Sequence, residues 1–117
     1  DVCIKNTCSS PKDLRITDMR ICEITSIRLN WVNYVIRIDT NQGVCGYGEV
    51  RDGASALYAK MLKRVLLGEN PCKIDKLFRR IQQFGGRARQ GGGVCAVEIA
   101  LWDLVGRIYG IPIWQML

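Results

Sequence analysis

Apolar and polar positions alternate along the first half of the chain in the manner of β-strands. The stretch from Leu14 to Ile27 carries spaced apolar residues and predicts a strand with a bulge near Asp18. Residues 34–39 (YVIRID) are dense in β-branched and aromatic side chains and predict a second strand. Residues 41–43 (NQG) supply a turn, and residues 44–50 (VCGYGEV) resume the extended pattern. These patterns predict a strand followed by a hairpin.

Glycine occupies two alternate positions of the third predicted strand. Gly46 and Gly48 alternate with Cys45 and Tyr47, so one face of this strand carries almost no side chains. Another stretch of backbone, or a ligand, is therefore able to approach that face closely.

After Gly53 the apolar residues recur at spacings of three and four, which is typical of helices. One predicted helix ends before Gly68, a second covers Ile74–Phe84, and a third covers about Val94–Tyr109. Their expected buried residues are Leu57, Met61, Leu62, Val65 and Leu66, then Leu77, Phe78, Ile81 and Phe84, then Val97, Leu101, Leu104, Val105 and Ile108. Asp103 and Arg107 are one turn apart and predict an ion pair.

The order of these elements indicates the fold class. Three strands precede three helices without strand–helix–strand alternation, which predicts an α+β fold: a three-stranded antiparallel meander followed by a helical bundle. Residues 1–13 are polar and aperiodic and are expected to form a leader to a domain of residues 14–117. The apolar tail from Ile111 to Leu117 resembles the start of a new element, so we expect the domain to be truncated there.

Composition and charge narrow the function classes. The chain has 117 residues, of which 48% are hydrophobic and 24% charged, as expected for one globular domain. Its formal charge is +6, and Arg79, Arg80, Arg87 and Arg89 crowd into one stretch. These arginines predict a solvated basic face, with one of them able to pair with a carboxylate. The alternative is a stand-alone nucleic-acid-binding module, since residues 85–93 (GGRARQGGG) resemble an RNA-binding tract.

Six cysteines and no histidine argue against a zinc site, because no Cys-x-x-Cys pair occurs. We expect free thiols in a reduced, cytoplasmic protein, with Cys3 and Cys8 as the one pair worth testing for oxidation. Acid–base chemistry also has few candidates, so no catalytic residue and no metal ligand is expected within this chain. Glu49, Arg51 and Asp52 form the best local polar cluster, which is equally consistent with a turn and with a substrate-facing role.

Residues 94–117 (VCAVEIALWDLVGRIYGIPIWQML) resemble the signature that ends the N-terminal capping domain of the mandelate racemase/muconate lactonizing group of the enolase superfamily. The matching residues are Cys95, Ala96, Glu98, Ala100, Leu101, Trp102, Asp103, Gly106, Arg107, Gly110, Pro112, Met116 and Leu117. The strand–turn–strand from Tyr34 to Glu49 is also similar, and the resemblance covers Leu14 to Leu117. Met116 departs from the usual Leu, and residues 1–13 have no counterpart.

The resemblance implies a TIM-barrel domain following this one. In such enzymes the barrel supplies acidic ligands for Mg²⁺ and the Lys or His bases that remove a proton α to a carboxylate. The capping domain closes over the barrel, excludes water and selects the substrate. The implied partners are the barrel domain, a small carboxylate or acid-sugar substrate, and other copies in a homo-oligomer. A membrane is excluded as a partner, and nucleic acid is disfavoured.

The resemblance further implies that two loops contact substrate, one around residues 24–33 and one around residues 50–53. Their candidate substrate-binding residues are Arg28, Asn30, Trp31, Asn33, Arg51 and Asp52. Arginine and amide groups suit a polyhydroxylated acid, which favours an acid-sugar dehydratase over a racemase or cycloisomerase. Trp102 and Asp103 are interpreted as structural, and the isolated chain is expected to be inactive.

Overall fold

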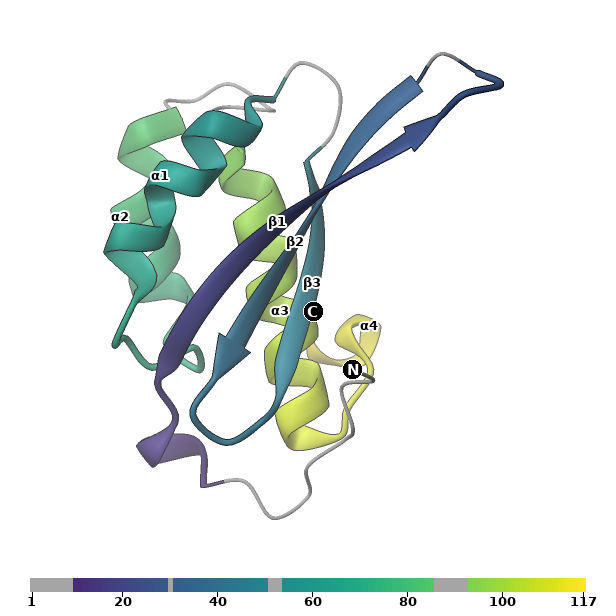
Figure 1. The fold of residues 1–117 in the computed structure, drawn as a ribbon. Helices are drawn as coiled ribbons and strands as arrows, with labels where there is room; N and C mark the ends of the chain where they lie inside the picture. Colours follow the sequence, from purple (N-terminus) through teal and green to yellow (C-terminus); the bar gives the residue numbers. More distant parts are fainter. Residues whose placement is uncertain (1–9, 30, 51–53, 86–92) are drawn as a thin grey trace.

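The computed structural model describes residues 10–29, 31–50, 54–85 and 93–117. These residues form a sheet with helices packed on one of its faces (Figure 1). The elements, in chain order, are a 3₁₀ turn η1 (Pro11–Asp13), β1 (Ile16–Ser26), β2 (Trp31–Thr40), β3 (Cys45–Val50), α1 (Ala56–Leu66), α2 (Ile74–Gly85), α3 (Val94–Tyr109) and α4 (Ile113–Met116). The α+β fold and the order of its elements are confirmed.

The sheet is an antiparallel meander in the order β1-β2-β3. β1 pairs with β2 from Ile16↔Thr40 to Ser26↔Trp31, and its register shifts between Ile16 and Asp18. That shift is the bulge predicted near Asp18. β3 pairs with β2 over a shorter stretch, from Tyr34↔Val50 to Asp39↔Cys45.

Helix α3 lies across the sheet on the side of β3 and explains the two alternate glycines. A Cβ atom added to Gly46 would overlap the carbonyl oxygen of Ala100, and one added to Gly48 would overlap that of Ala96. The close approach predicted for this strand face is therefore made by the backbone of α3. Gly110, in the left-handed conformation (φ 67°), ends α3 where predicted.

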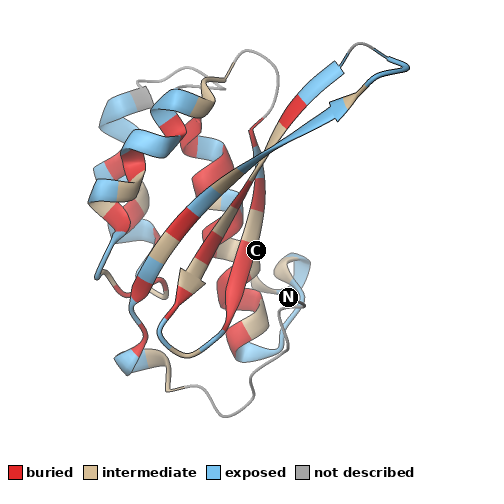
Figure 2. Cartoon of the chain, in the orientation of Figure 1, coloured by how far each residue is buried: buried red, intermediate tan, exposed pale blue. Residues whose placement is uncertain are grey.

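The core lies between the sheet and the helices, as the burial pattern in Figure 2 shows. Helix α3 contributes most to it, including Val97, Leu101 and Leu104, all without exposed surface. The prediction that Leu57, Met61 and Phe84 are buried in the core is wrong, because these side chains are 70%, 56% and 52% exposed. In α1 the buried positions are Ala59, Leu62 and Leu66, so Leu57 and Met61 fall on the flank turned away from the core.

The described part of the predicted leader is anchored to the domain. The Ser10 N–H donates to Gln42 Oε1 (2.8 Å), and Asn70 Nδ2 donates to the Pro11 carbonyl (2.8 Å). At the other end, α4 leaves Trp114 and Leu117 exposed. Cys22, Cys72 and Cys95 are not disulfide-bonded, as expected. Cys45 is disulfide-bonded, which contradicts the expectation of a wholly reduced chain.

Candidate functional site

The β1–β2 hairpin extends beyond the end of β3 as a two-stranded ribbon (Figure 1). The pairs Ile24↔Asn33, Thr25↔Val32 and Ser26↔Trp31 lie past the last β2–β3 pair, Tyr34↔Val50. The predicted loop of residues 24–33 is therefore too long, because most of it is strand and the turn begins only at Ile27. The β-branched and aromatic residues of this stretch favour the extended conformation.

The projecting ribbon carries an apolar surface. Ile27 is 96% exposed and Leu29 is 77% exposed, and Ile24, Trp31 and Val32 are also exposed. Arg28 lies in the turn and is exposed as well. Large apolar side chains grouped at one projecting end typically mark a surface that contacts another molecule or domain. The predicted surface of amide and arginine groups is thus, in its described part, mainly apolar.

Asn33 is the exception, because it is buried. It is 5% exposed, and its Nδ2 donates a hydrogen bond to Glu49 Oε1 at the end of β3. Its Oδ1 accepts from the backbone N–H of Tyr34 (3.1 Å). Across the strands, the negative charge of Glu23 and its hydrogen bond raise the pKa of the Tyr34 hydroxyl. The structure therefore places Trp31 and Arg28 at the surface and Asn33 in a hydrogen bond between strands.

The other predicted contacts, Asn30, Arg51 and Asp52, lie outside the described residues. The elements that flank residues 51–53 are described: β3 ends at the buried Val50, and Ser55 caps α1 by accepting from Tyr58 N–H (3.3 Å). The N-terminal ends of α1 and α3 lie at the same end of the molecule as the hairpin (Figure 1). The described elements thus bring the hairpin, the end of β3 and two helix starts to one end of the domain.

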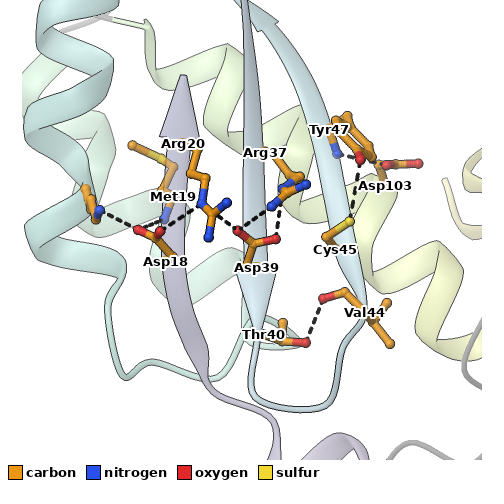
Figure 3. Close-up of polar contacts among 11 residues, drawn as sticks. Asp18, Met19, Arg20, Arg37, Asp39, Thr40, Val44, Cys45, Tyr47 and Asp103 are labelled. Carbon is orange, nitrogen blue, oxygen red and sulfur yellow. Dashed lines mark hydrogen bonds and ion pairs between the residues drawn. The ribbon is translucent and has the colours of Figure 1, made fainter. Parts of the chain in front are cut away.

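A chain of ion pairs crosses β1 and β2 nearer the other end of the sheet (Figure 3). Arg20 and Arg37 are directly opposite in the β1–β2 register. Asp39 lies between them and contacts both (3.5 Å to Arg20 Nε and 2.9 Å to Arg37 Nε), which offsets their repulsion. Asp18 joins this chain through Arg20 and reaches Lys63 on α1. The Lys63 and Arg20 hydrogen bonds hold the pKa of Asp18 at about 2.

Asp103 links α3 to the outer edge of β3. Its carboxylate accepts a hydrogen bond from the Tyr47 backbone N–H (2.9 Å). It also forms the predicted ion pair with Arg107 (3.0 Å). The Arg107 guanidinium also lies over the Tyr47 ring, 5.5 Å from its centre. These contacts confirm the prediction that Asp103 is structural. The contact with Tyr47 was not predicted, since nothing local in the sequence connects positions 47 and 103.

The described members of the arginine cluster are paired with carboxylates. Arg79 pairs with Asp75 (3.0 Å), and Arg80 pairs with Glu69. The hydrogen bonds from Arg80 and Lys76 lower the pKa of Glu69. Arg87 and Arg89 lie outside the described residues. Pairing of this kind weakens the nucleic-acid interpretation, because it uses positive charge that phosphates would otherwise attract.

Within the described ranges, His, Cys, Asp and Glu side chains do not gather in groups of three or more that could hold a metal ion. The helices in the described part of the chain are too short or too polar to span a membrane. The family resemblance implies Mg²⁺ ligands in the barrel domain and none in this chain.

Most of the chain matches a known protein family. Residues 18–117 match the family described as mandelate racemase/muconate lactonizing enzyme, N-terminal domain. The chain belongs to this family. This N-terminal domain is 31% identical over 119 residues to D-xylonate dehydratase of Haloferax volcanii, covering 97% of the chain and 28% of that protein. It is 32% identical over 108 residues to D-galactonate dehydratase of Verminephrobacter eiseniae, covering 85% and 28%.

A solved structure supports the same fold. A member of the enolase superfamily from Salmonella Typhimurium superimposes with a TM-score of 0.72 at 25% identity, over 88% of this chain and 29% of that one. The predicted enolase N-terminal-like fold is therefore confirmed. The N-terminal domain spans about 28% of the length of the curated relatives it matches.

Proposed function

We propose that this N-terminal domain caps the active site of a Mg²⁺-dependent enolase-superfamily enzyme that removes a proton α to a carboxylate, and that the enzyme is an acid-sugar dehydratase. The observation that carries the capping role is the hairpin, which projects beyond β3 with its apolar side chains exposed. The names of the relatives, D-xylonate and D-galactonate dehydratase, support the substrate class. A racemase or cycloisomerase of the same superfamily is the alternative.

In this proposal the cap contributes to catalysis by covering the substrate. The exposed apolar residues of the hairpin, Ile27 and Leu29 foremost, pack against the barrel and exclude water from the reacting carbons. Arg28 and Trp31, together with Asn30, Arg51 and Asp52, are the proposed substrate contacts. Arginine suits the carboxylate of a sugar acid because its fork of N–H donors matches two oxygens.

Proton abstraction belongs to the barrel in this proposal. Mg²⁺ would be held there and would stabilise the negative charge that develops on the carboxylate. The described residues of this chain supply neither a metal site nor a histidine base, so the domain alone should be inactive. Cytoplasmic location and homo-oligomerisation of the full-length enzyme remain part of the proposal.

The test uses the full-length protein that carries this domain. We expect an intact mass near 40 kDa, since a TIM barrel adds about 250 residues. With Mg²⁺ it should convert D-xylonate or D-galactonate to a 2-keto-3-deoxy acid with loss of water, and a chelator should abolish turnover. Epimerised product without water loss would favour the racemase alternative. Absence of turnover across a sugar-acid panel would contradict the dehydratase proposal.

A further inference from the structure

We propose that Asn33 and Glu49 form a clasp that fixes the angle of the projecting hairpin, so that both are positioning residues for the cap. The inference rests on the proposed capping function and deepens it. It also changes the role expected for Asn33, from a substrate contact to a residue that acts through the hairpin.

The geometry defines which atoms take part. The Tyr34 N–H is a donor, so the atom of the Asn33 side chain that it meets at 3.1 Å is the acceptor, Oδ1. The Nδ2 group then points to the opposite side, where it donates to Glu49 Oε1. Asn33 is 5% exposed and is therefore held between two partners instead of facing substrate.

The clasp lies where the pairing between β2 and β3 ends, so it can hold the start of the projecting ribbon. Among the described residues, the last pair between β2 and β3 is Tyr34↔Val50, and the described pairs of the ribbon beyond it join β1 and β2. Asn33 is the first β2 residue past that pair, and Glu49 precedes Val50 on β3. Their side chains thus extend the contact between β2 and β3 by one residue, at the point where the ribbon would otherwise bend.

Glu49 is exposed, unlike a hydrogen-bonding residue of the buried core. Water competes for an exposed carboxylate, so breaking the contact should loosen the ribbon while the buried core stays intact. An exposed glutamate could instead bind substrate directly through its charge. The two roles differ in a testable way, because glutamine keeps the acceptor oxygen and loses the charge.

The experiment measures hydrogen–deuterium exchange of the full-length protein without substrate. Asn33→Ala and Glu49→Ala should speed exchange of the hairpin amides, residues 22–33, by about tenfold, as expected for the loss of one hydrogen bond. Glu49→Gln should exchange at the wild-type rate. Thr25→Ala is the matched control, since Thr25 is an exposed hairpin residue whose side chain contacts Glu23 and not the clasp. Unchanged exchange in Asn33→Ala and Glu49→Ala would overturn the clasp, whatever the enzyme's substrate.

Kinetics with the best sugar acid separate positioning from direct binding. Both alanine variants should raise KM about tenfold and change kcat less than about threefold, since a loosened cap weakens binding more than chemistry. Glu49→Gln should restore KM. If Glu49→Gln loses activity while its hairpin exchange is normal, Glu49 binds substrate and the clasp proposal fails. If the wild type turns over no sugar acid, the proposed function fails, and the exchange data alone decide the clasp.

Discussion

Gly48 shows how one missing side chain fixes the contact between two layers. A Cβ atom there would overlap the carbonyl oxygen of Ala96, a backbone atom that cannot move without shifting α3. We predict that Gly48→Ala destabilises the domain by about 3 kcal/mol, at the upper end of overpacking costs. Gly43→Ala is the control: its φ is 76° and nothing lies within 4 Å of an added Cβ, so it should cost only about 1 kcal/mol. Urea unfolding measures both, and equal losses would contradict a tight α3–β3 contact.

Asp18 makes part of the stability dependent on pH. Its folded pKa of about 2 lies below the ordinary value of 3.8 because Lys63 and Arg20 hydrogen-bond the carboxylate. A lowered folded pKa means that this stabilisation is complete above about pH 4 and is lost as the pH falls towards 2. We predict that Asp18→Asn costs about 1 kcal/mol at pH 7, since both cations are partly exposed and screened.

Urea unfolding of wild type and Asp18→Asn between pH 7 and pH 2 tests this prediction. The two stabilities should converge near pH 2, where the wild-type carboxyl group takes up its proton. Asp75→Asn is the control, because its ion pair with Arg79 is exposed on both sides and should contribute less than about 0.5 kcal/mol. A difference that is as large at pH 2 as at pH 7 would show that Asp18 does not act through its charge.

At the scale of elements, Asp103 joins a helix to the outer edge of the sheet. Edge strands present N–H groups that can pair with another chain, and Asp103 occupies the Tyr47 N–H on β3. We predict that Asp103→Ala lowers stability by about 2 kcal/mol, because it removes a charged acceptor and the partner of Arg107. Asp103→Asn keeps an acceptor and should cost less. Thermal unfolding of both variants measures the difference, and equal losses would mean that only the ion pair matters.

The order and bounds of the elements were largely predictable from the sequence, because they follow from local patterns. The period of apolar residues and Gly110 placed α3 at the observed bounds, and the bulge near Asp18 was also predicted. The prediction of which helix residues are buried was less accurate. The spacing of apolar residues along a helix does not show how much of its surface the neighbouring elements cover. Leu57 on α1 illustrates this, being apolar and yet 70% exposed.

The candidate site was harder to predict because its contacts depend on register. Residue type alone predicts Asn33 to be a substrate contact, and only the pairing of three strands reveals that it contacts Glu49. A detectable signal existed for the ion-pair chain. Asp18 and Arg20, like Arg37 and Asp39, are opposite charges two positions apart on predicted strands, and such residues share a face.

For the molecule as a whole, two groups of exposed apolar residues lie at the hairpin and at the C-terminal end, apart from those on α1 and α2. In the second group Trp114 is 76% exposed and lines an open hollow together with Ile111, Ile113 and Arg107. Leu117 is 83% exposed. Such a patch promotes association when nothing covers it. We predict that the 117-residue chain self-associates in a concentration-dependent way and that Trp114→Ser reduces this.

Sedimentation velocity over a range of concentrations measures the association. Leu57→Ser is the matched control, because Leu57 is comparably exposed but lies on α1, which packs against β1, whereas α4 lies beside the C-terminal end of α3 (Figure 1). It should leave association unchanged. In the full-length protein the proposed barrel covers the patch, so Trp114→Ser should instead lower stability there, by roughly 2 kcal/mol for a large apolar side chain removed from a contact. Equal association of both variants, together with unchanged stability of the full-length protein, would mean that this surface stays open to solvent and that the barrel does not dock on it.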